Sequence, residues 1–378
     1  MSTTKFSDIM KRAKSEGKQV DEMSVCFALG YIAGAAAAEA EATESASVPM
    51  IGVGCWSFGS KNGEYWGERN QSDVDAIVSH ALKTGKKILF DTAEAYNEGR
   101  SEECLATALS RVENKDLLKN AVLASKILPQ NCGHVRTHFE KSLKRLKAES
   151  MDLYQVHWPL AKDGPSARQV FSELAALQSE GKLRHIGVSN FGVQQMKEAL
   201  SAGVKIATNQ LCYNLLTRAI EFDVIPFCRE HKIGVICYSP LLQGHITDKG
   251  ASVNSFDDAD PHRCRTRHFA GSRKMSRHGG KGHEGLLKKT LVDLGAIAAK
   301  SNVPLAKLAL AWAAARAPVV SVIPGARNVK QLQGNIDALT TPLDDATLKA
   351  LDDATDALKQ AMGKAIDIYE SDEKQRSF

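Results

Sequence analysis

Residues 152–190 read DLYQVHWPLAKDGPSARQVFSELAALQSEGKLRHIGVSN. The stretch opens with an apolar run of strand length that ends at His157, and a similar run closes it at Asn190. Between the two runs, apolar residues recur at helical spacing, and Gly181 stands where a helix commonly ends. These apolar residues are Val170, Leu174 and Leu177. A strand, a helix and a strand in this order predict one βαβ unit with parallel strands.

The same alternation extends in both directions from this unit. Apolar runs that we expect to be strands occur at residues 50–56, 87–93, 121–126, 152–157, 184–190, 206–210, 234–238 and 319–324. Eight strands with interleaved helices match the size of a (β/α)8 TIM barrel, which we expect over residues 50–355. The alternative is a doubly wound open sheet, which requires a G-x-G-x-x-G turn, and Gly52-Val-Gly54 lacks the third glycine. The pattern favours the barrel.

Local signals predict where two of the helices begin. Ser72, with Asp75 three residues later, has the pattern of a capping box. Asn328 precedes the last barrel helix, whose inward-facing residues are expected to be Val329, Leu332 and Ile336.

The two ends of the chain do not continue the barrel pattern. Residues 1–49 mix basic and acidic residues, and their apolar run at 25–38 is too short and too rich in glycine and alanine to span a membrane. Two interpretations of this N-terminal extension stay open: a helical or disordered segment, or a targeting segment for an organelle such as a plastid. Residues 356–378 are expected to form a C-terminal tail.

Composition narrows the class of protein. The chain has 43% hydrophobic and 25% charged residues, as globular proteins do, and a formal net charge of +5. Its basic residues are spread along the chain, which argues against nucleic-acid binding and favours an anionic small molecule as partner. The eight cysteines form no C-x-x-C pair, which indicates a reducing compartment and a cytoplasmic location. We expect no metal site.

Four chemically active residues follow successive strands. Asp91, Lys126 and His157 stand at the ends of the second, third and fourth strands, and Tyr96 lies five residues after Asp91. Catalytic residues of a barrel gather at these carboxyl ends.

Together the four residues predict carbonyl reduction. A phenol with a pKa near 10 is a poor proton donor at neutral pH, and Lys126 is expected to lower the pKa of Tyr96. Asp91 would hold the lysine, and His157 would hydrogen-bond the carbonyl oxygen. The alternative readings are a structural ion pair and a core histidine, but the joint arrangement favours catalysis.

Several stretches resemble the aldo-keto reductase family, in the order that the family shows. They are FDTAEAYNEGRSE at 90–102, ASK at 124–126, DLYQVHWP at 152–159 and GKLRHIGVSNF at 181–191. The resemblance covers residues 50–355 and implies a catalytic tetrad of Asp91, Tyr96, Lys126 and His157. One departure is Asn97, because a glycine usually follows the tyrosine. Its place beside the proton donor suggests an effect on substrate preference.

The resemblance also implies a binding site for NADP(H). The residues that would hold the nicotinamide and pyrophosphate are Ser189, Asn190, Gln210, Tyr238, Ser239 and Leu241. The residues that would hold the adenosine 2′-phosphate are Gly325, Arg327, Gln331 and Asn335. Arg327, just before a helix N-terminus, points to NADP rather than NAD. Trp56 and Trp158 are expected to line the substrate pocket.

The connection after the seventh strand, residues 243–284, is unusually long, and its part at 261–283 is basic. Three interpretations stay open. His262, Cys264 and His268 could bind a metal, although no recognised ligand spacing is present. Arg265 and Arg267 could close over cofactor phosphates as a lid, or the segment could be a solvated loop.

We therefore expect an NADPH-dependent enzyme that reduces an aldehyde or ketone, with a small carbonyl compound as substrate. The alternative is a non-catalytic, cofactor-binding barrel that serves as a regulatory or structural subunit. Such subunits tend to lose the histidine of the tetrad, and this chain keeps His157. The sequence therefore favours the enzyme.

Overall fold

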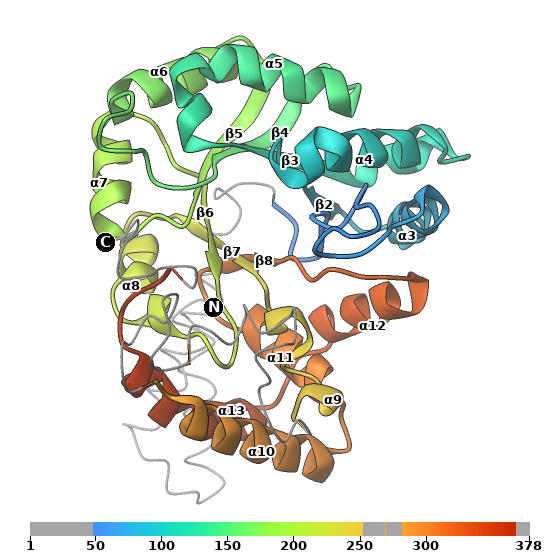
Figure 1. The fold of residues 1–378 in the computed structure, drawn as a ribbon, viewed down its shortest axis with the longest axis vertical. Coiled ribbons are helices and arrows are strands. Elements are labelled where there is room, and N and C mark those ends of the chain that lie inside the picture. Colours follow the sequence, from blue (N-terminus) through green and yellow to red (C-terminus); the bar gives the residue numbers. More distant parts are fainter. Residues whose placement is uncertain (1–47, 252–268, 270–281, 368–378) are drawn as a thin grey trace, which may run out of the picture. The chain divides into compact units, whose positions relative to one another are not determined.

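Eight parallel strands form the centre of the structure, a computed structural model that describes residues 48–251, 269 and 282–367. Each strand pairs with the next along the chain (Figure 1). Their bounds are β1 Gly52–Gly54, β2 Ile88–Asp91, β3 Ala121–Ile127, β4 Met151–Val156, β5 Leu183–Ser189, β6 Thr208–Cys212, β7 Gly234–Tyr238 and β8 Val319–Val322. A parallel bridge between Ile51 and Val322 joins the last strand to the first. The predicted (β/α)8 barrel is confirmed.

Two glycines let the ends of the sheet approach each other. A Cβ atom at Gly52 would overlap Cγ2 of Ile323, and one at Gly54 would lie 2.9 Å from the carbonyl oxygen of Ile323. Only a residue without a side chain fits at such close contacts. The glycines of β1 are therefore needed for the closure of the barrel.

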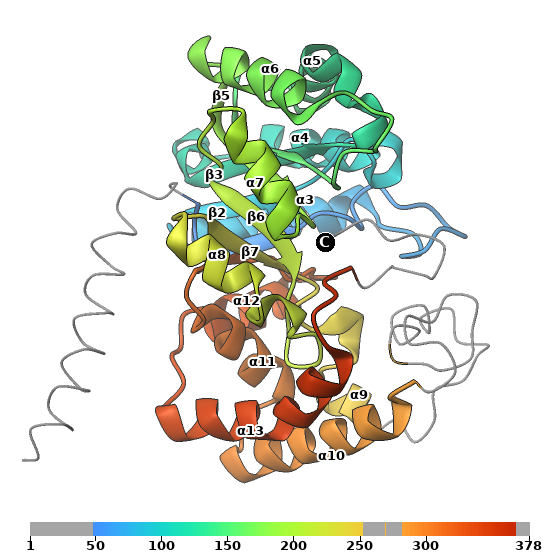
Figure 2. The same cartoon turned by 90° about the vertical axis from the view of Figure 1, so that its left-hand side faces the viewer.

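One helix of the barrel follows each strand and lies against the outside of the sheet (Figures 1 and 2). Apolar side chains of these helices belong to the hydrophobic core. These helices are α3 Gln71–Lys83, α4 Arg100–Ser110, α5 Val135–Leu146, α6 Ala167–Ser179, α7 Val193–Ser201, α8 Val224–Glu230, α11 Leu305–Ala314 and α12 Val329–Leu339. Short 3-10 turns lie in the connections: η1 Tyr96–Gly99, η2 Lys115–Asn120, η3 Pro129–His134, η4 Ala219–Glu221 and η5 Leu242–Gly244.

Within the described residues, three further helices lie outside this alternation. They are α9 Asp248–Ala251, α10 Glu284–Ser301 and α13 Asp345–Met362. The last two lie side by side in both views (Figures 1 and 2) and contact each other. Because α13 runs to Met362, ordered helix continues past residue 355, where the barrel was expected to end.

The predicted helix ends can be compared with the observed ones. Asn328 caps α12 by accepting a hydrogen bond from the backbone N–H of Gln331, and Gly181 has a φ of 74° just after α6, as expected. The capping box at Ser72 was wrong. The helix α3 begins one residue earlier, at Gln71, and the carboxylate of Asp75 instead accepts hydrogen bonds from Gln71 and Arg111.

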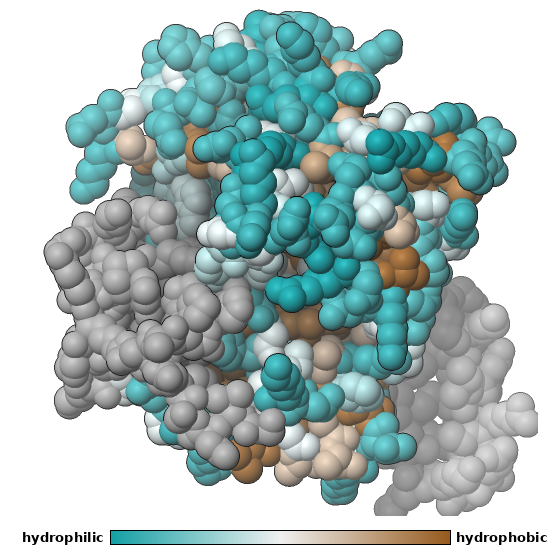
Figure 3. All heavy atoms as spheres, turned by 45° about the vertical axis from the view of Figure 1, so that its right-hand side comes forward, coloured by the Kyte–Doolittle hydropathy of each residue, from teal (hydrophilic) through white to brown (hydrophobic). Residues whose placement is uncertain are grey.

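On the face drawn in Figure 3, the described residues are mainly hydrophilic, with scattered apolar spots. The large hydrophobic side chains that are exposed in the described part of the chain are Tyr65 and Val292. Within it, no helix has the length and apolar character needed to cross a membrane. Residues 1–47 of the N-terminal extension lie outside the described residues, as do Arg265, Arg267 and the metal candidates His262, Cys264 and His268.

Candidate active site

The four predicted catalytic residues meet at the carboxyl end of the barrel. Asp91 is the last residue of β2, Lys126 lies in β3, and His157 directly follows β4. Tyr96 begins η1, the short turn that follows β2. Parallel pairing of neighbouring strands brings the first three side chains to one end of the sheet, and η1 folds the tyrosine over them.

Lys126 is the centre of this group. Its buried ammonium lies 2.5 Å from Asp91 Oδ2 and donates to the carbonyl oxygen of Thr92 over 2.8 Å. It also donates to the phenol oxygen of Tyr96 over 3.2 Å, and lies 4.7 Å from the centre of the tyrosine ring. The lysine therefore stands between a carboxylate and the phenol, as expected for an activating group.

The second carboxylate oxygen of Asp91 accepts hydrogen bonds from two buried amides. Gln210 Nε2 donates to Oδ1 over 2.8 Å, and Gln155 Nε2 donates to it over 3.3 Å. Gln155, which lies in β4 two residues before His157, was not predicted from the sequence. The available signal was a polar residue in an apolar strand, on the same face as His157, because side chains alternate along a strand.

The pKa of Tyr96 differs from the value expected from the sequence. Burial, and then the negative charge of Asp91, raise the pKa of Tyr96 well above its ordinary value. The sequence-based prediction that Lys126 lowers this pKa was wrong, because burial penalises the phenolate and the negative charge of Asp91 disfavours it further. Burial also lowers the pKa of Lys126, and the nearby carboxylate of Asp91 opposes that change.

His157 is held as a neutral imidazole. Burial, and then the positive charge of Lys126, lower its pKa well below the ordinary value. Its ring meets that of Tyr96 edge to face, with centroids 5.6 Å apart. Its Nδ1 atom is buried and has no hydrogen-bond partner among the described residues. An unsatisfied buried nitrogen costs free energy, and such a group at a cavity is a place where a ligand can complete the hydrogen bonding.

A cavity of about 1040 Å³ opens above these residues. Asp91, Tyr96 and His157 line it, and Lys126 lies buried beneath them. The remaining predicted site residues that line the cavity are Trp56, Trp158, Ser189, Asn190, Gln210, Tyr238, Ser239, Leu241, Gly325, Arg327, Gln331 and Asn335. The structure therefore brings every predicted site residue to one cavity or directly below it.

Amide and hydroxyl groups cluster next to the tetrad. Asn190 Nδ2 donates to the carbonyl oxygen of His157 over 3.0 Å, and Asn190 Oδ1 accepts from the hydroxyl of Tyr238 over 2.9 Å. Ser189 Oγ donates to the carbonyl oxygen of Gln210 over 2.9 Å. The side-chain Nε2 of Gln210 is directed at Asp91. The side-chain oxygen Oε1 of Gln210 is therefore the end of this amide that is available to a ligand amide.

The segment after β7 has a constrained backbone. Ser239 has a φ of 49°, in the left-handed region that few residues other than glycine adopt. Asn214, in the loop after β6, donates from Nδ2 to the carbonyl oxygen of Ser239 over 3.0 Å. This hydrogen bond joins two neighbouring loops and holds Ser239 at the cavity wall.

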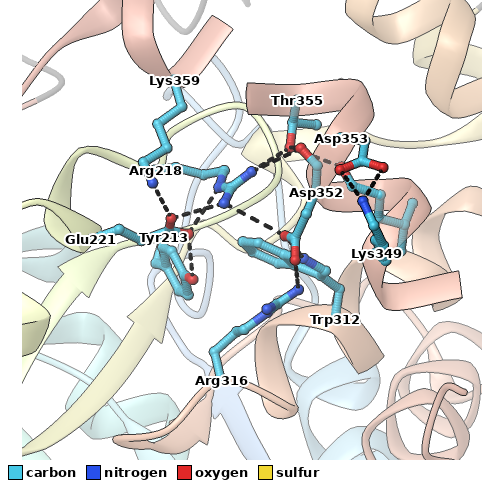
Figure 4. Close-up of polar contacts among 11 residues, drawn as sticks. Tyr213, Arg218, Glu221, Trp312, Arg316, Lys349, Asp352, Asp353, Thr355 and Lys359 are labelled. Carbon is cyan, nitrogen blue, oxygen red and sulfur yellow. Dashed lines mark hydrogen bonds and ion pairs between the residues drawn. The ribbon is translucent and has the colours of Figure 1, made fainter. Parts of the chain in front are cut away.

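A network of ionic side chains anchors the loop after β6 (Figure 4). Arg218 makes paired hydrogen bonds of 2.8 Å to Glu221, and it also bonds Thr355 of α13. Asp352 of α13 accepts from the Trp312 indole over 3.0 Å. The loop that carries Asn214 is thereby tied to α13, and Asp352 of α13 is bonded in turn to Trp312 of α11.

Cationic side chains lie at the start of α12. Arg327 is exposed and lines the cavity, and its backbone N–H donates to Gln331 Oε1 over 2.7 Å. Asn335 Nδ2 donates to the carbonyl oxygen of Gly325 over 3.3 Å. A second arginine that the sequence argument missed, Arg69 of the loop after β1, also lines this cavity.

Aromatic residues form the wall beside Tyr96. Trp56 stacks on Tyr96 with ring centroids 5.8 Å apart, and on Tyr65 at 5.6 Å. Trp66 meets Trp56 edge to face at 5.2 Å and lines the cavity, although the sequence argument did not select it. With Trp158, these rings make the region around the phenol largely apolar.

The chain is similar to a known protein family and to known proteins. The model of the aldo/keto reductase family matches residues 50–356. The chain belongs to this family. Methylglyoxal reductase YeaE of Escherichia coli is 31% identical over 324 residues, covering 83% of the chain and 93% of the relative.

Two further relatives are described with different cofactors, one with NADH and the other with NADP. NADH-specific methylglyoxal reductase of Escherichia coli is 28% identical over 342 residues, covering 84% of the chain and 98% of the relative. The crystal structure of a Klebsiella pneumoniae aldo/keto reductase in complex with NADP and acetate has a TM-score of 0.61 and 26% identity. The match covers 82% of the chain and 92% of the Klebsiella pneumoniae protein.

The structure accounts for the departure of this aldo-keto reductase at Asn97. The residue has a φ of 52°, and asparagine tolerates this left-handed region better than most residues. Its amide donates to the carbonyl oxygens of Trp56 and Phe58 over 3.0 and 2.7 Å. Asn97 is not among the cavity-lining residues, whereas Trp56, whose carbonyl oxygen it binds, is one of them.

Proposed function

We propose that the chain is an NADPH-dependent reductase of aldehydes or ketones. The observation that carries the proposal is the contact of 3.2 Å between the Lys126 ammonium and the Tyr96 phenol, beside a neutral His157. These groups border a cavity. Amide side chains line the part of the cavity close to the tetrad, and arginines line the part near the start of α12. The arrangement supplies a proton donor, a carbonyl-binding group and a place for a dinucleotide.

The residues present fit NADP(H). The side-chain oxygen of Gln210 and the hydroxyl of Ser189 can hydrogen-bond a carboxamide, which offers both donors and an acceptor. Arg327 adjoins the N-terminus of α12, where backbone N–H groups and the helix dipole favour an anion. The NADP bound to the Klebsiella pneumoniae relative supports this choice.

The chain's own residues would manage the proton. Bound NADPH supplies the hydride. Tyr96 Oη gives its proton to the carbonyl oxygen as negative charge develops there, and a developing alkoxide is basic enough to take it from a phenol of raised pKa. The Lys126 ammonium then stabilises the phenolate, and Asp91 keeps the ammonium in place. The neutral ring of His157 orients the carbonyl group by a hydrogen bond.

The complete constellation favours this function over the alternative of a non-catalytic subunit. A binding module has no need of a buried ammonium aimed at a phenol. The proposal is tested by following NADPH absorbance with a panel of carbonyl compounds that includes methylglyoxal. We expect substrate-dependent oxidation of NADPH by the wild-type protein, and none with any carbonyl would overturn the proposal.

The pH dependence follows from the two shifted acidities. His157 has a lowered pKa and so stays neutral above about pH 6.5, the ordinary value, whereas Tyr96 has a raised pKa and stays protonated below about pH 10. Neither group changes charge between these values. We therefore expect kcat/KM of the carbonyl substrate, at saturating NADPH, to be flat across this window. A slope near pH 8 would show that the phenol is more acidic than its surroundings indicate.

Arg327 is expected to read the 2′-phosphate. Arg327→Ala should weaken NADPH binding about 10- to 100-fold, the value of a hydrogen bond between charged groups, and change NADH binding little. Fluorescence titration with both cofactors measures this difference. Lys330→Ala is the matched control, because Lys330 is an exposed cation of the same helix that does not line the cavity. Equal losses for both cofactors would contradict the role of Arg327.

A further inference from the structure

Arg69 is an unexplained cation at the cavity. It lies in the loop between β1 and α3 and is half-buried, with Nη2 donating to the carbonyl oxygen of Ala326 over 2.9 Å. This hydrogen bond spans 257 residues of sequence and fixes the guanidinium against the turn that precedes α12. Arg69 lines the same cavity as Gly325, Ala326 and Arg327.

A second cation stands beside it. Arg327 is the residue after Ala326, and its charge, after burial, lowers the pKa of Arg69. Asp73 opposes this shift, but no ion pair between either arginine and a carboxylate occurs in the described ranges 48–251, 269 and 282–367. Two guanidinium groups thus lie near each other on a concave wall, where their mutual repulsion would be relieved by an anion between them.

We infer that Arg69 is a second ligand of the 2′-phosphate of NADPH and, with Arg327, determines the preference for NADPH over NADH. The inference rests on the proposed function. A phosphate monoester carries about −1.5 to −2 charges at pH 7, which two arginines match. Guanidinium forks also suit phosphate oxygens geometrically. NADH has no such phosphate and leaves the two neighbouring cations without an anion between them, so the pair attracts one cofactor and disfavours the other.

The two arginines come from opposite ends of the barrel sequence. Arg69 follows β1, whereas Arg327 follows β8, and these strands are neighbours only because the barrel closes. The loop that ends near Arg69 also carries Trp56 and Trp66 of the aromatic wall. One loop therefore contributes to both the substrate region and the phosphate region.

The test compares Arg69→Gln with wild type by fluorescence titration of NADPH and NADH. Glutamine can keep a hydrogen bond to the Ala326 carbonyl oxygen but has no charge. We expect NADPH to bind about 10-fold or more weakly, while NADH binds as before or more tightly. Adenosine 2′,5′-bisphosphate and AMP, measured by calorimetry, should show the same difference without the nicotinamide. Lys61→Gln is the control, because Lys61 is an exposed cation of the same loop outside the cavity.

The possible outcomes separate a ligand from a structural support. A loss of affinity that is equal for NADPH and NADH would mean that Arg69 only holds the turn before α12, and would overturn the inference. Unchanged affinity for both cofactors would overturn it as well. In either case, NADPH oxidation with a carbonyl by the wild-type protein would leave the proposed function standing.

Discussion

Replacing Tyr96 with phenylalanine is expected to lower kcat for carbonyl reduction by about 10²- to 10⁴-fold, the usual contribution of a general acid. The substitution keeps the ring that stacks on Trp56 and lies 4.7 Å from the Lys126 ammonium, so the fold should be retained. NADPH affinity should change little, because the hydroxyl acts on the carbonyl oxygen in the transition state. Steady-state rates and fluorescence titration measure the two effects separately.

Tyr65→Phe is the matched control for this experiment. Tyr65 belongs to the same aromatic group, but its hydroxyl donates to Gln243 Oε1 over 2.6 Å and does not approach Lys126. Removing that hydroxyl should leave kcat within about threefold of wild type, as surface substitutions usually do. Near-normal turnover of Tyr96→Phe, or an equal loss in Tyr65→Phe, would remove Tyr96 from the role of proton donor.

The barrel and the position of its candidate site could be predicted because both depend on local patterns. Apolar runs of strand length define the strands, and parallel strands necessarily carry their carboxyl ends to one side. Asp91, Lys126 and His157 follow three consecutive strands, so their proximity required no knowledge of side-chain packing. The candidate phosphate region was predicted from the family resemblance together with a helix start that Asn328 marks.

Residues whose roles depend on closure of the barrel could not be predicted in this way. Arg69 stands in an irregular loop and meets Ala326 only because β1 adjoins β8. Gln155 was overlooked because its partners, Asp91 and Gln210, come from two other strands. The direction of the Tyr96 pKa shift needs the burial of the phenol as well as its neighbours. A sequence shows the neighbours along a strand but not the depth of a group.

Lys126→Met is expected to reduce both activity and stability. The substitution leaves the carboxylate of Asp91 buried without its counter-ion, and removal of one partner from a buried ion pair typically costs about 3–5 kcal/mol. Turnover should fall at least about 10²-fold, because no positive charge then stabilises the phenolate of Tyr96. Urea unfolding and steady-state kinetics measure the two losses. A single variant does not separate a catalytic lysine from a structural one, since both would lower the measured rate.

The double variant Asp91→Asn/Lys126→Met separates these roles. Asparagine keeps an oxygen that can accept from Gln210 and Gln155, and the pair then holds no unpaired charge. The free energy of unfolding should therefore return to within about 2 kcal/mol of wild type, because a neutral pair avoids the cost of a buried ion. Turnover should remain as low as in Lys126→Met, since the ammonium beside Tyr96 is still missing. If kcat recovers together with stability, the ion pair supports only the fold, and Lys126 is not the activator of the phenol.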